Sequence, residues 1–294
     1  MAHFKVPTLL SIVVTGATGH LGRLIVESLL RRGVPAGEIV AVGRDLSKIA
    51  DLGARGVVVR PADYDGPDSL RSAFAGAEKL MFVSGSEVGR RVAQHRNVIA
   101  AAKAAGVGLV VYTSIPKADT AGMRLAEEHH ATEREIIASG LPYVFLRNSW
   151  YLENYTAQLP VYLEHGIAGA AGTGRVSAAT RADFAEAAAA VLTTEGHTNQ
   201  VYELGGAPFT MAELAEEVSR QGGRQVTYTD LPEATYAEVL AGAGLPEPYP
   251  VILADSDRGL ARGELHVEGE DLEKLIGRPP TPLAEAVRAA LRDR

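Results

Sequence analysis

Three glycines lie at intervals of three residues in the stretch SIVVTGATGHLGRLIVESLLRRG, at Gly16, Gly19 and Gly22. They follow an apolar, β-branched run and precede a helical pattern. In such a turn the first glycine permits the bend, the second lets the backbone approach a pyrophosphate, and the third lets helix and strand pack closely. The N–H groups at the start of the helix then bind the anion. The spacing predicts a dinucleotide-binding turn made of Gly16, Ala17, Thr18, Gly19, His20, Leu21 and Gly22; a purely structural turn is the alternative.

The second predicted strand ends in AVGRD, residues 41–45. An acidic residue at this point binds the ribose 2′-hydroxyl of NAD, whereas an arginine accommodates the 2′-phosphate of NADP. Arg44 therefore favours NADP, and Asp45 is expected to cap the helix that follows. The alternative is that Arg44 is a solvated surface residue and Asp45 turns towards the ribose.

The proton-transfer pair of the commonest short-chain dehydrogenases is missing. In that pair a lysine follows a tyrosine by four residues on a helix, which lowers the pKa of the tyrosine. None of the ten tyrosines of this chain has a lysine four residues later. Reduction of an unactivated ketone needs such a donor, whereas an acceptor that is already electrophilic can be reduced by hydride delivery through proximity alone.

Metal chemistry is not predicted either. The chain has no cysteine, and His129, His130 and Glu133 do not form a zinc-binding HExxH pattern. The net charge of −7 and the lack of a basic stripe argue against nucleic-acid binding. No stretch approaches the roughly 20 apolar residues of a membrane span, which predicts a cytoplasmic protein without a membrane-spanning segment.

Alternating elements are expected to position these residues. Apolar runs at 11–15, 38–43, 56–60, 79–84, 109–114 and 143–147 alternate with helical patterns. Continuous apolar strands between helices predict an α/β Rossmann fold with a doubly wound parallel sheet. We expect an NADP-binding domain over residues 1–155, to which 182–206 returns, and a smaller α/β substrate-side domain over 207–294. The loop at 169–174 is either a mobile lid or a turn.

Several segments together resemble the NmrA-like group of atypical short-chain dehydrogenases. They include TGATGHLG, VGRD, FVSGSEVGRR, RNSWYLENY and SAATRADFAEAAAAVL, and the resemblance covers nearly the whole chain. Within that group the chain is most similar to bacterial quinone oxidoreductases that use NAD(P)H. The resemblance implies NADPH-dependent, two-electron reduction of quinones to hydroquinones.

Two other functions stay open beside this one. The NmrA-like group also contains regulators that bind NADP and sense redox state without turnover. Relatives similar to isoflavone reductase reduce activated carbon–carbon double bonds, but they rely on a lysine in the helix that here reads EEHHATEREII, which contains none.

The resemblance also implies site residues beyond the glycine turn and Arg44. The loop after the fourth strand is expected beside the cofactor, and two later segments are expected to line the nicotinamide and quinone cleft. These residues are Gly85, Ser86, Glu87, Asn148, Ser149, Trp150, Tyr151, Leu152, Glu153, Thr180 and Asp183. Gly85 stands where a serine is expected in close relatives.

Tyr151 and His129 are the candidates for a catalytic role. Trp150 is either an aromatic wall of the cleft or part of the core. Asp63 and Tyr64 are expected either near the adenine or in a simple turn, and Ser114 either at the site or merely at the end of its strand. A homodimer is a further expectation.

Overall fold

The computed structural model describes residues 11–292, which form two compact units. Unit 1 contains the chain up to Thr113, Thr132–Phe145 and Ala188–Gln200. Unit 2 contains Ser114–Ala131, Leu146–Ala187 and the chain from Val201 onward. The domain boundaries expected from the sequence separate a cofactor-binding part from a substrate-binding part, whereas the two units are defined by contacts between residues. The expected boundaries therefore stay predictions.

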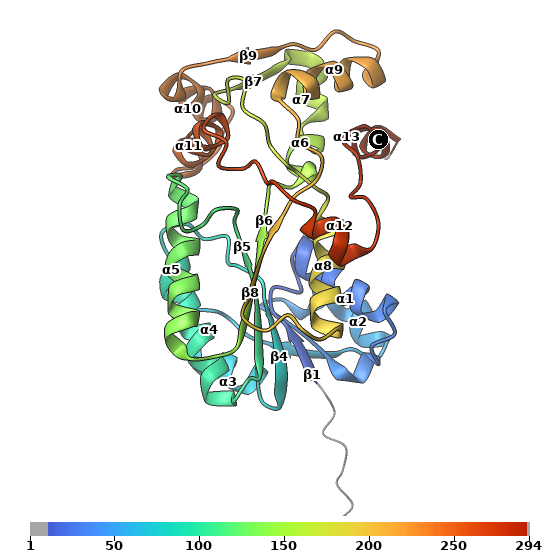
Figure 1. The fold of residues 1–294 in the computed structure, drawn as a ribbon, viewed down its shortest axis with the longest axis vertical. Coiled ribbons are helices and arrows are strands. Elements are labelled where there is room, and N and C mark those ends of the chain that lie inside the picture. Colours follow the sequence, from blue (N-terminus) through green and yellow to red (C-terminus); the bar gives the residue numbers. More distant parts are fainter. Residues whose placement is uncertain (1–10, 293–294) are drawn as a thin grey trace, which may run out of the picture. The chain divides into compact units, whose positions relative to one another are not determined.

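A seven-stranded sheet has the order β3-β2-β1-β4-β5-β6-β8 (Figure 1). Its first six strands have the order of the dinucleotide-binding doubly wound fold, which confirms the predicted Rossmann architecture. The described pairs of β1 with β2 and β4, of β2 with β3, and of β4 with β5 are parallel. The strands are β1 (Ser11–Val14), β2 (Ile39–Gly43), β3 (Val58–Pro61), β4 (Ala77–Phe82), β5 (Leu109–Ser114), β6 (Tyr143–Asn148) and β8 (Gln200–Leu204).

The six apolar runs predicted β1 to β6, with ends that differ from the observed ones by no more than two residues, and β8 lies in the segment 182–206 that was expected to return to this domain. The reason is burial: all five residues of β2 and the last three of β1 are buried, as in parallel sheets covered on both faces. The apolar residues just before Ser11, which the sequence also predicts to belong to the first strand, lie outside the described part of the chain.

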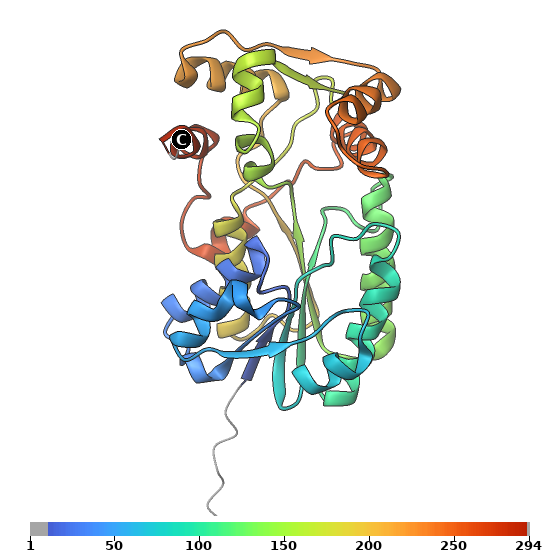
Figure 2. The ribbon, with the colours of Figure 1, turned by 180° about the vertical axis from the view of Figure 1, so that it is seen from behind.

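Helices cover both faces of this sheet (Figures 1 and 2). On one face lie α1 (His20–Arg31) and α2 (Ala50–Ala54), and on the other lie α3 (Pro67–Ala73), α4 (Arg91–Ala105) and α5 (Arg124–Ser139). The helix α1 forms because Leu21, Ile25 and Leu29 repeat every four residues and are buried on one side. The helix that Asp45 was expected to cap is instead the 3₁₀ turn η2 (Leu46–Ile49) followed by the short α2; a second 3₁₀ turn is η1 (Ala36–Glu38).

Unit 2 consists mainly of helices, with one small parallel ladder that pairs Ile167 of β7 with Tyr228 of β9. A capping box between Thr210 and Glu213 starts α9, and Leu214 and Val218 of this helix enter the unit's core. The elements are α6 (Leu152–Thr156), α7 (Leu159–His165), β7 (Ile167–Gly169), α8 (Arg181–Thr193), α9 (Met211–Gly222), β9 (Tyr228–Asp230), α10 (Glu233–Gly242), α11 (Tyr249–Ala261), α12 (Asp271–Ile276) and α13 (Leu283–Arg292). The end of α8 belongs to unit 1.

Two functional expectations can be compared with the fold directly. Between residues 11 and 292, none of the helices combines the length and the apolar character that crossing a bilayer requires. The same residues contain no group of three or more histidine or carboxylate side chains that could hold a metal ion.

Candidate functional site

The glycine turn between β1 and α1 has a conformation that only glycine adopts without strain. Gly16 has φ +62°, in the left-handed region. The N–H of Ala17 donates to the carbonyl of Val42 at 2.9 Å, and the N–H of Gly19 donates to the carbonyl of Gly16 at 2.9 Å. The turn is therefore fixed at the carboxyl ends of β1 and β2, the edge at which doubly wound sheets bind their ligands.

Gly22 and Gly19 serve this turn differently. A Cβ atom on Gly22 would lie 2.3 Å from the carbonyl oxygen of Gly16, so α1 can approach the turn only with glycine there. Gly19 has φ −95° and ψ 171°, which any residue can adopt, and no side chain caps α1 at this position. The first N–H groups of α1 have no partner within the helix and no acidic residue in the first turn, so they suit an anion.

Arg44 lies just beyond β2 and is largely solvent-exposed. Its Nη1 atom is 3.3 Å from Oε1 of Glu87. Asp45 accepts hydrogen bonds from the N–H and hydroxyl of Ser47, at 3.1 and 2.6 Å, and these bonds lower the pKa of its carboxyl group. This confirms Asp45 as a cap, here of the 3₁₀ turn η2, and the expected contact of Arg44 with the 2′-phosphate stays a prediction.

Thr18 of the glycine turn lies where a side chain at Gly43 would otherwise be. A Cβ atom on Gly43 would lie 2.4 Å from Cγ2 of Thr18. The side chain of Thr18 therefore packs over Gly43 at the end of β2, and Gly43 directly precedes Arg44 in the sequence. The absence of a side chain at Gly43 brings the two predicted parts of the dinucleotide site together within unit 1.

The loop after β4, which carries Gly85, Ser86 and Glu87, is anchored to α4. The N–H of Gly85 donates to Nε2 of His95 at 2.9 Å, and Nε of Arg91 donates to the carbonyl of Gly85 at 2.7 Å. Burial, helped by the charge of Arg91, lowers the pKa of His95 to about 3. His95 is therefore neutral, and its Nδ1 proton points at Oγ1 of Thr132, 2.9 Å away. Sequence reasoning missed His95, since nothing local distinguishes it from a surface histidine.

Asp63 and Tyr64 form the turn that was one of their two expected roles. Oδ1 of Asp63 accepts the N–H of Asp65 at 3.1 Å. The hydroxyl of Tyr64 lies 2.6 Å from Oγ1 of Thr15 and 2.7 Å from the carbonyl of Val83. Burial raises the pKa of Tyr64. Its hydroxyl thus stays neutral and ties β1 to β4.

In unit 2, Asn148 at the end of β6 carries a buried acceptor without a partner. Among the buried side-chain nitrogen and oxygen atoms of residues 11–292, the Oδ1 atom of Asn148 is the one that has no hydrogen-bond partner. Asn148 is also hydrogen-bonded to the hydroxyl of Tyr151, and because Oδ1 is unpaired this bond comes from Nδ2. A buried unpaired carbonyl oxygen costs free energy, so Oδ1 is suited to a donor on a bound ligand.

Tyr151 is surrounded by groups with opposing effects on its acidity. Burial raises the pKa of its hydroxyl, while Arg181 and the hydrogen bond from Asn148 act in the other direction. The guanidinium carbon of Arg181 lies 4.7 Å from the centre of the Tyr151 ring, and Phe184 meets that ring edge-on at 5.6 Å. The net effect is a raised pKa, so the phenol of Tyr151 stays neutral between its two ring contacts.

The neighbours of Tyr151 make structural contacts. Ser149 donates its hydroxyl to the carbonyl of Leu265 at 2.9 Å, and Leu152 and Trp150 pack with the core of unit 2. Oε1 of Glu153 accepts the N–H of Arg181 at 2.9 Å. The structure thus favours the core interpretation of Trp150, and the expected cofactor contacts of this segment stay predictions.

Thr180 and Asp183 organise the start of α8. The hydroxyl of Thr180 donates to Oδ2 of Asp183 at 2.7 Å. Asp183 is fully buried and also accepts hydrogen bonds from Arg278, at 2.7 Å, and from the N–H of Thr281, at 2.9 Å. His129 and Ser114, the remaining candidates, are buried as well.

The loop at 169–174 is an anchored turn rather than a free segment. Three consecutive N–H groups donate to side chains: that of Ala170 to Asp257, that of Ala171 to Tyr228 and that of Gly172 to Asp230, at 2.8, 2.9 and 2.8 Å. Burial, with a contribution from the charge of Asp230, raises the pKa of Asp257 to about 6. No sequence pattern singled out Asp257.

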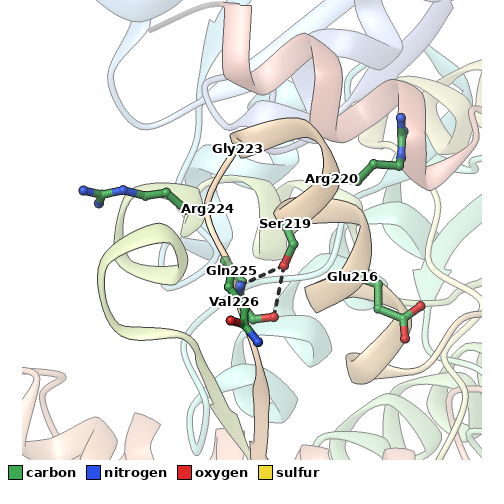
Figure 3. A pocket seen from close by; sticks show the side chains of 7 residues that line it. All are labelled: Glu216, Ser219, Arg220, Gly223, Arg224, Gln225 and Val226. Atoms are coloured by element: carbon green, nitrogen blue, oxygen red, sulfur yellow. Dashed lines mark hydrogen bonds between the residues drawn. The ribbon is translucent and has the colours of Figure 1, made fainter.

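A shallow surface depression at the end of α9 contains none of the predicted site residues (Figure 3). Ser219 there is engaged by Val226, whose N–H donates to its hydroxyl at 2.8 Å. We assign this depression no role.

The strand order and the glycine turn define a dinucleotide-binding protein of the Rossmann class. The chain belongs to the NmrA-like family, whose family model matches residues 10–278. It is 51% identical over 278 residues to Quinone oxidoreductase 2 of Escherichia coli K12, a match that covers 94% of this chain and 97% of that protein.

Two solved structures extend the comparison. The NADPH-dependent quinone oxidoreductase QOR2 of E. coli, complexed with NADPH, matches with a TM-score of 0.92 and 50% identity, over 95% of this chain and 99% of that one. Triphenylmethane reductase of a Citrobacter species, complexed with NADP(H), matches with a TM-score of 0.90 and 40% identity, over 96% of this chain and all of that one.

Proposed function

We propose that this protein is an NADPH-dependent quinone oxidoreductase that reduces quinones to hydroquinones by two-electron transfer. The observation that carries the proposal is the 51% identity to E. coli Quinone oxidoreductase 2 across nearly the full length of both chains. The match to the NADPH-bound structure of QOR2 supports the same cofactor.

The residues present fit NADPH. The N–H groups at the start of α1 would hold the pyrophosphate, because they have no partner within the helix and Gly19 places no side chain beside them. Arg44 would hold the 2′-phosphate, and the anchored loop at 85–87 would lie alongside. NADPH supplies a hydride when it is bound.

On the substrate side the chain positions groups rather than supplying a strong acid. Oδ1 of Asn148 would accept a hydrogen bond from an N–H of the cofactor's carboxamide, since a quinone has no donor, and this bond would give the unpaired oxygen a partner. Tyr151 would form one wall of the quinone site, with a hydroxyl that stays protonated at neutral pH because burial raises its pKa. His129 is the second candidate for contact with the substrate.

The test is the consumption of NADPH by the purified protein in the presence of a simple benzoquinone, followed at the absorbance band of reduced nicotinamide. We expect turnover with NADPH well above the rate without protein, and slower turnover with NADH. Tight NADPH binding without turnover would overturn the enzyme assignment and favour the redox-sensing regulator. An enone and a triphenylmethane dye, offered in parallel, test the other substrate classes of similar proteins.

A cytoplasmic location and a homodimer belong to the same proposal. The location is supported by the use of NADPH, a reductant kept inside cells, and cell fractionation tests it. Light scattering of the purified protein tests the dimer.

A further inference from the structure

Glu87 lies between two arginines of unit 1. Its Oε1 atom is 3.3 Å from Nη1 of Arg44, and its Oε2 atom is 2.8 Å from Nη1 of Arg90. Arg90 has a second partner, Asp65, at 2.7 Å. The carboxylate of Glu87 therefore engages one terminal nitrogen of the Arg44 guanidinium, the group expected to bind the 2′-phosphate of NADPH.

We propose that Glu87 is a specificity-determining residue that competes with the 2′-phosphate of the cofactor for Arg44. The proposal rests on the function proposed above, since it takes Arg44 as the 2′-phosphate ligand. Carboxylates and phosphates bind guanidinium groups through the same N–H donors. A 2′-phosphate that approaches Arg44 has to displace or share this carboxylate, and the two anions repel each other.

The surrounding contacts keep Glu87 in place for this competition. Its loop is fixed two residues earlier, where Gly85 is bonded to His95 and Arg91. Glu87 retains Arg90 as a partner when Arg44 is taken by phosphate, so it is displaced from one arginine only. The 2′-hydroxyl of NAD(H) carries no charge, so it does not repel the carboxylate of Glu87 and does not need to displace it from Arg44. Glu87 consequently lowers the affinity for NADP(H) and leaves that for NAD(H) unchanged.

The variant Glu87→Gln tests this competition, because it removes the charge and keeps the size of the side chain. Calorimetric titrations with NADP⁺, NAD⁺ and adenosine 2′,5′-bisphosphate measure binding without turnover. We expect NADP⁺ and the bisphosphate to bind about two- to fivefold more tightly, the range set by exposed ion pairs. The affinity for NAD⁺ should stay the same.

Two controls separate this effect from a change in net charge. Glu135 is a second ion-paired glutamate of unit 1. Its described arginine partner is Arg96, at 2.7 Å, and its side chain is 29% exposed, against 34% for Glu87. Glu135→Gln should leave all three affinities unchanged. In an Arg44→Ala background, Glu87→Gln should no longer strengthen NADP⁺ binding, since the guanidinium for which the anions compete is gone.

Unchanged or weaker NADP⁺ binding by Glu87→Gln would overturn the proposal, and so would equal tightening of NADP⁺ and NAD⁺. The quinone assay distinguishes this failure from failure of the proposed function. A wild-type protein that reduces benzoquinone while Glu87→Gln binds NADP⁺ normally refutes the competition alone. A protein without quinone turnover, in which the variant tightens NADP⁺ selectively, refutes the function and retains the competition.

Discussion

Replacing Gly22 with alanine is expected to cost both stability and dinucleotide binding, whereas the same change at Gly19 is expected to cost binding alone. The Cβ atom of an alanine at position 22 would lie 2.3 Å from the carbonyl oxygen and 2.6 Å from the carbonyl carbon of Gly16. At position 19 the corresponding approach to the Gly16 oxygen is 3.3 Å. The first clash requires a backbone shift, and the second only a small adjustment.

The magnitudes follow from opposing effects. Alanine in place of glycine inside a helix contributes about 1 kcal/mol, and overpacking costs about 1–3 kcal/mol. The clash at Gly22 is with backbone atoms that cannot rotate away, so its cost lies near 3 kcal/mol and the net loss is about 2 kcal/mol. At roughly 2–4 °C per kcal/mol, Tm falls by about 4–8 °C. Gly19 has an extended backbone, so Tm of Gly19→Ala should stay within about 2 °C of wild type.

The assay combines thermal unfolding with NADPH titration of each variant. Both variants should lose affinity for NADPH, because Gly22→Ala distorts the turn and Gly19→Ala places a methyl group where the pyrophosphate approaches the N–H groups. Gly37→Ala is the matched control, since an added Cβ there meets nothing within 4 Å. An unchanged Tm for Gly22→Ala would refute the packing argument, and normal NADPH affinity of Gly19→Ala would refute the place of the pyrophosphate.

Three further predictions concern single side chains. Arg44→Ala should weaken NADPH binding by about 1.5 kcal/mol, the lower end for a charged hydrogen bond because the side chain is exposed, and equal losses of NADPH and NADH in titrations would contradict its role. Tyr151→Phe should change kcat little and Tyr151→Ala should raise KM for quinone; a loss of about a thousandfold in kcat with phenylalanine would make the hydroxyl the proton donor. Burial raises the pKa of Asp257 to about 6, so ionisation opposes folding as pH rises through about 4 to 6. Chemical unfolding should therefore show Asp257→Asn gaining about 3 kcal/mol over wild type between about pH 4 and pH 7, and a constant difference would count against the raised pKa.

The local pattern of the chain determined most of the fold. The apolar runs predicted strand positions that differ from the structure by two residues at most. The reason is that a parallel strand buried on both faces consists almost entirely of apolar residues, which are visible in the sequence. The positive φ of Gly16 and the cap at Asp45 were equally local, since the first depends on the residue type and the second on a residue two positions away. The prediction of one helix after Asp45 was wrong in type, because the local residue pattern cannot distinguish a 3₁₀ turn with a short helix from one longer helix.

Tertiary structure alone decided which side chains meet. Glu87 reaches Arg44 across 43 positions, and His95 is neutral because it is buried next to Arg91. The unpaired oxygen of Asn148 and the raised pKa of Asp257 likewise arise from burial among residues distant in sequence. The sequence specifies each side chain and its immediate neighbours, but burial and charge pairing depend on the segments that packing brings together.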